Sequence, residues 1–361
     1  MPSILIDAER LRNPNSGLGQ VCLHLGRQLL RERPATRPGG SWDLTFLVPK
    51  GSTGVFGSSA NHVEASWLRR LWIPGRYDVW HCLHQDSVYL PTRSKLILTI
   101  YDLNFLERSD YSAAKKARRL AGLQRRIDRA SLVTAGSDYT ASVVREHLNV
   151  PSTTPLRVVY TGVAVREQDA AAEAPPFLAD DDGPFFLFVG AIHPRKNLHT
   201  LLPLLEAFPG HRLVLAGPDH HPYAQHLRER AKGIGVADRL VMPGGVHEST
   251  KLWLYANCEA FLFPSLSEGF GLPVLEAMVF GKPVFISRLT SLPEVGGEDA
   301  YYFETFEPES MAQVLRDGVR DFDRDAGRKE RLRMRAARFR WTSVAAEYWK
   351  LYQELAAGLP T

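Results

Sequence analysis

Two glutamates flank a glycine-bearing turn in the second half of the chain. Glu268 and Glu276 lie on either side of Gly269 and Gly271, after a short apolar run and around the start of a helix-length segment. Glycine lets the backbone approach a ligand without a Cβ atom, and a helix N-terminus presents N–H groups and partial positive charge to an anion such as a diphosphate. The carboxylates can accept hydrogen bonds from sugar or ribose hydroxyls. Singly, each acid is also an ordinary loop or helix-start residue; their joint placement around the turn favours a ligand site.

A pair of cations forms a second candidate element. Arg195 and Lys196 follow an apolar run that ends at Gly190, and a helix is expected to begin near Asn197. At the carboxyl end of a strand, these cations could neutralise negative charge on a departing diphosphate, a task that other phosphate enzymes give to Arg, Lys or Mg²⁺. We therefore expect that no metal ion and no cofactor is required.

Three points in the front half place glycines or polar side chains after an apolar run. The glycines would allow close approach to a donor phosphate or an acceptor, and the polar groups could position acceptor hydroxyls. For the two histidines, acceptor contact and ordinary loop packing fit the sequence equally well, and no third ligand indicates a metal site. These residues are Gly17 and Gly19, His81 and His84, and Tyr101 and Asp102.

The elements that must position these residues follow a βα pattern. Short apolar runs alternate with helix-length amphipathic segments, and their continuous hydrophobicity is typical of strands buried on both faces of a parallel sheet. The sequence therefore predicts an α/β fold of two Rossmann-like, doubly wound parallel-sheet domains that face a cleft. The expected strands are residues 4–7, 44–48, 78–82, 96–100, 131–136 and 156–160, then 185–189, 212–216, 239–242, 260–263 and 283–287.

The length of 361 residues also indicates two domains. We place the front domain at residues 1–165, a linker rich in Ala, Pro and acidic residues at 166–183, and the second domain at 184–341. The three consecutive aspartates at 180–182 precede a strand, so we interpret them as solvated linker residues and not as a metal-binding cluster.

The last helix is expected over residues 342–358, with Thr342 or Ser343 available as its N-cap. Its apolar stripe must cover a surface, and we assign the helix to the front domain. The stripe consists of Val344, Tyr348, Leu351, Tyr352 and Leu355.

Composition excludes several classes of protein. Hydrophobic residues make up 44% and charged residues 23%, so a disordered or fibrous chain has no support. No segment reaches the roughly 20 apolar residues of a membrane span, and the first residues do not form a secretory signal. The three cysteines lack a CxxC pairing, which argues against a disulfide framework or zinc site and favours a reducing cytoplasm, with the thiols buried.

Charge is concentrated in the front half, where residues 1–165 carry 22 Lys and Arg against 13 Asp and Glu. Residues 113–130 contain seven basic residues and one acid in a helical pattern, and residues 67–72 mix Trp and Leu with two arginines. A solvated surface helix is the commoner explanation; the alternative is docking on the anionic inner face of the plasma membrane. No recognised motif indicates nucleic acid as a partner.

Together these segments resemble the retaining glycosyltransferases of family 4, which have the GT-B fold. The resemblance implies a nucleotide-sugar donor, a glycan or lipid-linked acceptor, and transfer with retention of anomeric configuration by front-face attack, in which the leaving phosphate takes the acceptor's proton. EGFGLPVLE is the most specific of the matching segments, which occur in the family's order along nearly the whole chain. They are SGLG, IYDL, SDYTASVV, VYTGV, VGAIHPRKNL, VMPGGV, FPSLSEGFGLPVLEAM and SLPEVGG.

The resemblance also implies individual roles. Glu268 would contact the transferred sugar, Glu276 the ribose, and the backbone around Val246 the base. With the residues identified above, the expected catalytic group is Glu268, Lys196, Arg195 and Asp102; the expected donor contacts are Glu276, Gly269, Phe270, Gly271, Leu272, Gly190, Val246, Gly17 and Gly19; the expected acceptor contacts are Ser16, His81, His84 and Tyr101.

Two positions depart from the family's pattern. Tyr101 stands where many relatives have histidine, and Ala191 where many have arginine, so Arg195 is expected to substitute. We expect transfer of a hexose or deoxyhexose in cell-surface polysaccharide synthesis, with a GDP-mannose-type donor favoured and a UDP-sugar as the alternative. A sugar-nucleotide epimerase of the same fold and a non-catalytic nucleotide- or membrane-binding module are the rival hypotheses. A glycoside hydrolase fits less well, because the cations suit a diphosphate.

Overall fold

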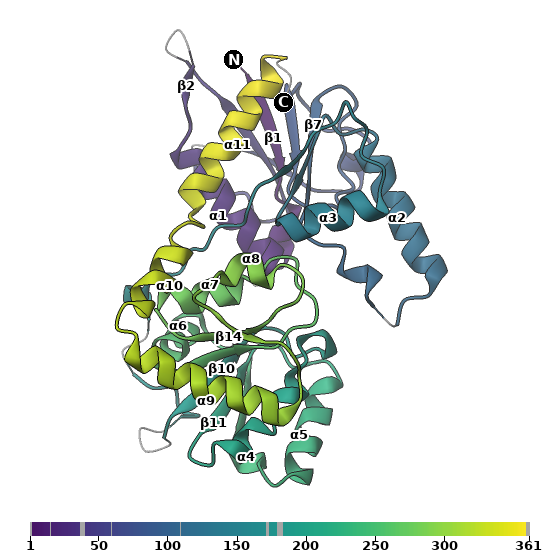
Figure 1. Ribbon diagram of the computed structural model, residues 1–361. Coiled ribbons are helices and arrows are strands. Elements are labelled where there is room, and N and C mark those ends of the chain that lie inside the picture. The colour runs from purple at the N-terminus through teal and green to yellow at the C-terminus, as the bar shows by residue number, and fades with distance from the viewer. Residues whose placement is uncertain are drawn as a thin grey trace. The chain divides into compact units, whose positions relative to one another are not determined.

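The computed structural model describes residues 2–14, 16–36, 40–58, 60–108, 110–170, 173–178 and 183–358 (Figure 1). The chain divides into two compact units: residues 1–162 with 339–361 form the first, and residues 163–338 form the second. Each unit contains a parallel sheet with helices packed against it. The expected α/β class with two Rossmann-like sheets is confirmed.

The first unit is built on a seven-stranded sheet in the order β5-β4-β1-β6-β7-β8-β9, in which all neighbours are parallel. The chain runs from β1 outward to one edge and then returns to fill the other side, so the strand order reverses between β1 and β6. The strands are β1 (Ser3–Asp7), β4 (Asp43–Val48), β5 (Asn61–Glu64), β6 (Val79–Cys82), β7 (Lys95–Ile100), β8 (Leu132–Ala135) and β9 (Leu156–Val158), and a separate antiparallel pair is β2 (Ala35–Thr36) and β3 (Gly40–Ser41).

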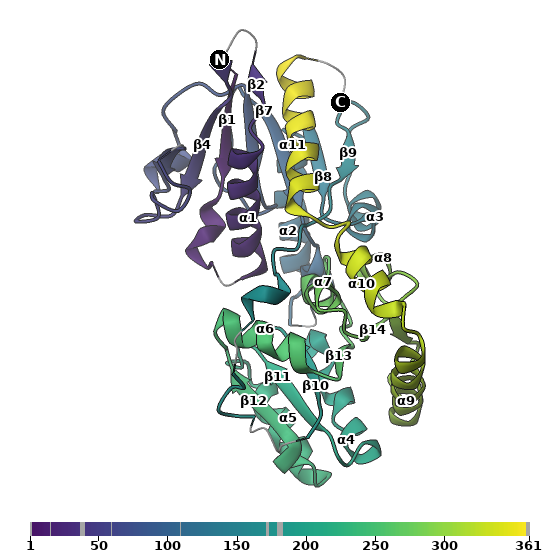
Figure 2. The ribbon, with the colours of Figure 1, turned by 90° about the vertical axis from the view of Figure 1, so that its left-hand side faces the viewer.

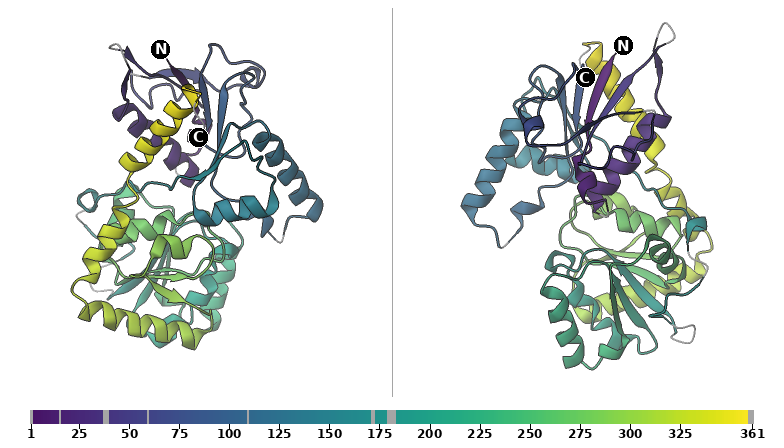
Figure 3. Two further views of the ribbon diagram at one scale, coloured as in Figure 1. Left: turned by 45° about the horizontal axis from the view of Figure 1, so that its top comes forward. Right: turned by 180° about the vertical axis from the view of Figure 1, so that it is seen from behind.

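Helices cover both faces of this sheet: α1 (Gly17–Arg31), α2 (Ala113–Ile127), α3 (Asp138–His147) and α11 (Trp341–Ala356). α1 and α11 lie side by side and share one apolar core with Ile4 (Figure 2). α2 and α3 contribute to a second core that contains Leu5, and Figure 3 shows α2 and α11 on different sides of the sheet. Successive residues of β1 thus serve opposite cores, which explains the continuous apolar runs.

The second unit is built on a six-stranded parallel sheet in the order β12-β11-β10-β13-β14-β15. α6 and α7 pack on the central strands, α9 packs on β15, and α10 packs on α7. The strands are β10 (Phe185–Val189), β11 (Arg212–Ala216), β12 (Leu240–Gly244), β13 (Ala260–Phe263), β14 (Val284–Ser287) and β15 (Tyr301–Phe303); the helices are α4 (Leu204–Ala207), α5 (Tyr223–Gly233), α6 (Glu248–Asn257), α7 (Leu272–Val279), α8 (Leu292–Gly296), α9 (Pro308–Arg324) and α10 (Arg328–Ala336).

All eleven strands expected from the sequence are present within about two residues of their expected bounds. The edge strands β5 and β15 and the β2–β3 pair were not expected. The three cysteines are free and buried, as expected.

The last helix required two corrections to the expectation. α11 begins at Trp341, and its N-cap is Arg340 without a side-chain cap bond, so Thr342 and Ser343 are not caps. All five residues of the expected stripe are buried, and α11 belongs to the first unit. In the expected linker, the short 3-10 helix Glu167–Asp169 packs on α6 as part of the second unit, whereas the aspartates at 180–182 lie outside the described residues.

Candidate functional site

The second sheet changes strand order between β10 and β13, its two central strands. From β10 the chain proceeds through β11 to β12 on one side, and then crosses to β13, β14 and β15 on the other. In open parallel sheets, ligands bind outside the carboxyl ends of the strands at such a switch point. The segments that follow β10 and β13 are those that carry the cations and Glu268.

Arg195, Lys196 and Glu268 form one cluster at this switch point. The Lys196 ammonium donates to Glu268 Oε1, and Arg195 Nη1 donates to Glu268 Oε2 at 3.2 Å and to the Ser267 carbonyl at 2.8 Å. The Lys196 and Glu268 side chains are only 6% and 9% exposed, whereas Arg195 is 37% exposed. The structure therefore brings together three of the four expected catalytic residues, with Arg195 as the member that solvent reaches.

Burial and charge together set the ionisation of this cluster. Burial lowers the pKa of Lys196 to about 8, although Glu268 acts in the opposite direction. For Glu268, burial acts to raise the pKa, but Lys196 and Arg195 outweigh it and hold the pKa below its ordinary value. Lys196 and Glu268 are therefore both charged at neutral pH, and with two cations against one carboxylate the cluster carries one surplus positive charge.

The turn that carries Glu268 is fastened to the segment after β14. The Glu268 N–H donates to Thr290 Oγ1 at 3.1 Å, and Ser291 Oγ donates to the carbonyls of Glu268 and Phe270 at 3.1 and 2.8 Å. The backbone of Thr290 has a left-handed φ of 54°, a conformation that residues other than glycine rarely adopt. Sequence reasoning gave neither residue a role, because these bonds span more than 20 residues.

Gly271 ends the turn and serves as N-cap of α7 with a φ of 115°. A Cβ atom at this position would lie 2.8 Å from Leu292 Cδ2, so both the backbone conformation and the space require glycine. Pro273 occupies the first turn of α7, as expected from the fixed φ of proline. Gly269, Phe270 and Leu272 complete the segment between Glu268 and the helix; their donor contacts stay predictions.

Glu276 lies one turn into α7 and is held by α6. Its Oε1 accepts from Lys251 Nζ at 3.1 Å, and its Oε2 accepts from the Tyr255 hydroxyl at 2.8 Å. Lys251 also pairs with Glu248, at 3.0 Å; burial acts to lower the pKa of Lys251, but Glu276 and Glu248 prevail and raise it. Lys251 was missed by sequence reasoning, since nothing local links it to Glu276.

Three further backbone positions lie at the same edge of the sheet. Gly190 follows β10 with a φ of 149°, and a Cβ atom there would approach Phe188 and Lys196. Val246 follows β12, immediately before the N-cap of α6. Gly217, which sequence reasoning missed, follows β11 with a φ of 151°, and a Cβ atom there would overlap the Gly190 carbonyl.

Gly17 and Gly19 both lie in the first turn of α1, but their surroundings differ. Ser16 is the N-cap: its hydroxyl donates to the Asn13 carbonyl at 2.7 Å and accepts from the Gly19 N–H at 3.1 Å. A Cβ atom on Gly19 would overlap that carbonyl, so close packing within the loop explains this glycine. A Cβ atom on Gly17 would meet nothing within 4 Å, so the space beside Gly17 is open to a ligand.

Two expected acceptor contacts are wrong. His81 is fully buried in β6, where its ring nitrogens bond to the Tyr352 hydroxyl at 2.7 Å and to Thr99 Oγ1 at 2.8 Å. Tyr101 belongs to the apolar core beneath α11 and presses on Gly136. Both side chains pack against α11; His81 has no surface to offer an acceptor, and Tyr101 is only 9% exposed.

His84 and Asp102 follow β6 and β7 at the carboxyl edge of the first sheet. Asp102 is half-buried, and its Oδ1 accepts from the Asn104 N–H at 3.1 Å within a local turn. His84 is 3% exposed and lines a cavity together with residues that follow β1. The described residues contain no group of three or more His, Cys, Asp or Glu placed to hold a metal ion.

Comparison with known proteins decides the class. Residues 169–338, nearly all of the second unit, match the family of glycosyl transferases group 1. The chain is a glycosyltransferase. The O-antigen chain mannosyltransferase B of Escherichia coli is 25% identical over 98% of this chain and all of its own length. The GDP-mannose:cellobiosyl-diphosphopolyprenol alpha-mannosyltransferase of Komagataeibacter xylinus is 31% identical over 54% of this chain and 50% of its own length.

The fold of this glycosyltransferase is GT-B. Sucrose-phosphate synthase from Thermosynechococcus elongatus superposes with a TM-score of 0.75 over 99% of this chain and all of its own, at 18% identity. None of the helices in the described part of the glycosyltransferase combines the length and apolar character that a membrane span requires.

Proposed function

We propose that this chain is a retaining glycosyltransferase of family 4 that transfers mannose from GDP-mannose to a lipid-linked glycan in cell-surface polysaccharide synthesis, without a metal ion. The names of both relatives above specify mannosyl transfer, and one of them specifies GDP-mannose and a diphosphopolyprenol acceptor. The relatives support the donor and the class of acceptor; the chemistry of the second unit supports the type of reaction.

The observation that carries the proposal is the cluster of Arg195, Lys196 and Glu268 at the switch point of the second sheet. Two cations face one carboxylate, so one positive charge remains for an incoming anion. Both cations are fixed before a ligand arrives, because Glu268 bonds to each of them. Preorganised charges of this kind stabilise negative charge that develops on a leaving diphosphate.

The remaining donor contacts follow from the positions around this cluster. The diphosphate lies against Arg195, Lys196 and the N-terminus of α7, and the transferred sugar lies against Glu268. Glu276, fixed by Lys251 and Tyr255, accepts hydrogen bonds from ribose hydroxyls with its remaining lone pairs. The leaving phosphate takes the proton of the attacking hydroxyl on the same face of the sugar, which retains the configuration.

A panel of nucleotides tests the donor site. GDP should raise the melting temperature of the full chain more than UDP or ADP, and mass spectrometry with GDP-mannose should show a product one hexose heavier. Glu276→Gln should weaken GDP binding about tenfold, as expected for the loss of charge-assisted bonds. Glu248→Gln is the matched control, because Glu248 also pairs with Lys251 but is 62% exposed. Stabilisation by UDP alone would replace the proposed donor, and equal effects of both variants would remove the role of Glu276.

The stereochemistry and metal requirement have separate tests. Proton NMR of the first product formed from an α-linked donor should show an α linkage, and a β linkage would overturn retention. Turnover should be unchanged after dialysis against EDTA, because Arg195 and Lys196 supply the positive charge that Mg²⁺ supplies in other phosphate enzymes. Loss of turnover in EDTA, restored by Mg²⁺ or Mn²⁺, would overturn metal independence.

Access to a lipid-linked acceptor gives a role to the exposed apolar loop of residues 67–72, here called the Trp loop. Trp67, Leu68, Leu71 and Trp72 are 70%, 56%, 78% and 67% exposed. Between them lie Arg69 and Arg70, and α2 adds further basic residues to the same unit. Interfacial tryptophans beside cations fit an anionic bilayer surface, so the chain attaches there peripherally.

Liposome co-sedimentation tests this attachment. Binding should require anionic lipid and should fall several-fold in Trp72→Ala. Met334→Ala is the matched control, because Met334 is 62% exposed on α10 in the other unit. Equal binding to neutral vesicles would remove the electrostatic part of the proposal, and equal effects of both variants would remove the Trp loop.

A further inference from the structure

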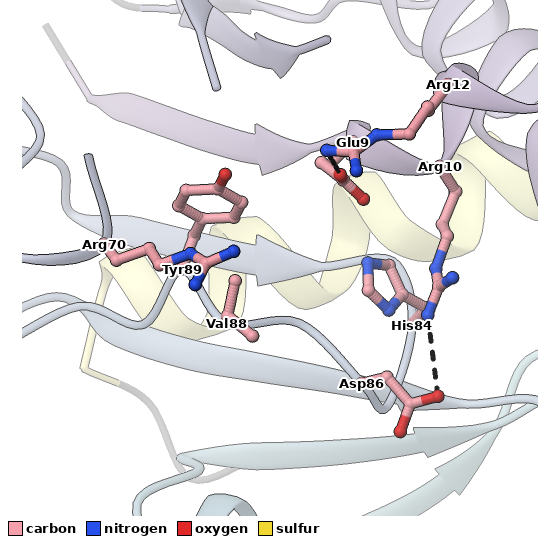
Figure 4. A pocket seen from close by; sticks show the side chains of 8 residues that line it. All are labelled: Glu9, Arg10, Arg12, Arg70, His84, Asp86, Val88 and Tyr89. Carbon is pink, nitrogen blue, oxygen red and sulfur yellow. Dashed lines mark hydrogen bonds and ion pairs between the residues drawn. The ribbon is translucent and has the colours of Figure 1, made fainter. Parts of the chain in front are cut away.

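A cavity of about 160 Å³ lies at the carboxyl edge of the first sheet. Three residues from the segment after β1 line one part of it, and four residues from the segment after β6 line another. Since the strand order reverses between β1 and β6, this is the switch point of the first sheet, where open parallel sheets bind ligands. The lining residues are Glu9, Arg10, Arg12, Arg70, His84, Asp86, Val88 and Tyr89 (Figure 4).

The cavity contains buried polar atoms without partners. Three buried nitrogen atoms have no hydrogen-bond partner among the described residues. They are both ring nitrogens of His84 and the Nε atom of Arg10. The Asp7 carboxyl oxygen Oδ2 lies 3.8 Å from His84 Nε2, too far for a hydrogen bond. A buried polar atom left without a bond costs about 1–3 kcal/mol, so a ligand that bonds to His84 and Arg10 would recover free energy.

The charge of the cavity selects an anion. Its two carboxylates are already paired, Glu9 with Arg12, and Asp86 with Arg10 at 3.5 Å and with Arg119 at 3.2 Å. In the described part of the chain, Arg70 has no ion-pair partner. Figure 4 shows Arg70 on one side of the cavity and Arg10 with His84 on the other, so an anion between them would meet guanidinium groups from two sides.

Ionisation of the neighbouring groups agrees with this geometry. Burial, followed by the charges of Arg10 and Arg126, lowers the pKa of His84 to about 3, so the imidazole is neutral at pH 7. A neutral imidazole donates one N–H and accepts with its other nitrogen. His84 can therefore donate to a phosphate oxygen without first taking up a proton.

The position of Arg70 indicates what the anion is attached to. Arg70 is the last residue of the 3-10 helix Leu68–Arg70 within the Trp loop, so the exposed side chains of Leu71 and Trp72 follow it directly. A ligand whose phosphate contacts Arg70 therefore has an apolar surface next to it. The volume of the cavity is below the roughly 300–1,000 Å³ of pockets that enclose a drug-sized ligand, so it suits a compact head group and not a nucleoside.

We propose that this cavity binds the diphosphate of the lipid-linked acceptor, held between Arg70 on one side and Arg10 and His84 on the other, while its isoprenoid chain leaves along the Trp loop. The inference rests on the proposed function for the identity of the acceptor. It assigns a second phosphate site to the first unit, separate from the donor site at Arg195 and Lys196.

Calorimetric titration of the full chain with farnesyl diphosphate, a short and soluble isoprenoid diphosphate, tests the site. GDP is kept at saturation so that the donor site is filled. Arg70→Ala and Arg10→Ala should each weaken binding about tenfold or more, as expected for the loss of one charge-assisted contact. Arg69→Ala is the matched control, because it removes the same charge from the same loop. Arg69 does not line the cavity, and its Cζ atom lies 5.7 Å from the centroid of the Trp72 ring. Arg69→Ala should change the affinity by less than about twofold.

Three outcomes would overturn the inference. An equal loss in Arg69→Ala and Arg70→Ala would show general attraction to charge. Loss of farnesyl diphosphate binding in Lys196→Ala, with no effect of Arg70→Ala, would place the ligand in the donor site. Inorganic pyrophosphate bound as tightly as farnesyl diphosphate would show a site for free phosphate with no role for the lipid.

The donor proposal and this inference can fail separately. If GDP and UDP give no stabilisation but farnesyl diphosphate binds in an Arg70-dependent way, the cavity is supported and the donor assignment falls. If GDP binds and farnesyl diphosphate does not, the donor assignment stands and the cavity has another role, which overturns the inference.

Discussion

Replacing Glu268 by glutamine should disable the donor site far more than it destabilises the fold. The variant has the shape of the wild type but leaves Lys196 buried without its carboxylate. Removal of one partner from a buried ion pair ordinarily costs about 3–5 kcal/mol, because the remaining charge is uncompensated. Lysine can avoid most of this cost by giving up its proton.

The pKa of Lys196 sets how much of this cost deprotonation avoids. Burial already lowers it from 10.5 to about 8, which at about 1.36 kcal/mol per unit is roughly 3 kcal/mol borne by the wild type. At pH 7.5 a fully neutral Lys196 costs roughly 4 kcal/mol, so loss of Glu268 adds less than about 1 kcal/mol through Lys196. The lost bond from Arg195 adds about another 1 kcal/mol. We therefore expect a total loss of about 1–2 kcal/mol.

Thermal melting and GDP titration measure the two effects separately. For a unit of this size the expected loss lowers the melting temperature by about 2–8 °C. GDP affinity should fall at least tenfold at about pH 7.5, because the diphosphate now meets a neutral amine, and it should recover partly in a second titration at about pH 6, because a lower pH favours the protonated amine. Glu248→Gln, an exposed acid of the same unit, should change the free energy of unfolding by less than about 0.5 kcal/mol. A loss of 4 kcal/mol or more together with unchanged GDP affinity at both pH values would refute the reasoning.

Three further predictions concern single positions. GDP affinity of the wild type should fall as pH rises through about 8, and Lys196→Arg should remove this fall in a pH series of titrations. Lys196 binds its proton more tightly in the unfolded chain than in the folded one, so the free energy of unfolding of the wild type should rise as pH increases from about 8. Gly19→Ala should lower the melting temperature, because its Cβ would overlap the Asn13 carbonyl, whereas Gly17→Ala should not, and activity assays of Gly17→Ala then report on a ligand beside it. Burial raises the pKa of Asp7 from 3.8 to about 6, so stability should decrease as pH rises through that window, and Asp7→Asn should flatten the slope in urea titrations.

The strands that the sequence predicted are those with a continuous apolar run. β1 and β10 are buried on both faces, so every residue bears the signal. β5, with the sequence NHVE, is an edge strand with no buried residue, and β15 has three residues. Short or polar edge strands form because a neighbour offers a ladder of hydrogen bonds, and that information lies outside the strand.

The clustering of Arg195, Lys196 and Glu268 was predictable from the sequence, whereas the contacts of His81 were not. Arg195, Lys196 and Glu268 each lie just after a predicted strand, and parallel strands end at one edge, so strand prediction alone brings them together. His81 lies one residue before the end of its strand and points to the face that α11 covers. Its partner Tyr352 is 271 residues away, and no local pattern distinguishes such a core histidine from a ligand-binding one.

The two switch points use the same topology but compensate their charges differently. At the second sheet, Lys196 and Glu268 satisfy each other inside the protein, and the surplus charge on the exposed Arg195 faces outward. At the first sheet, the carboxylates are paired, while the buried nitrogen atoms of His84 and Arg10 have no partner among the described residues. A site whose charges are already compensated can bind and release a ligand with little rearrangement of its own. A site with orphaned donors recovers the cost of its unpaired atoms when a ligand bonds to them, so a bound diphosphate should stabilise the first unit against unfolding.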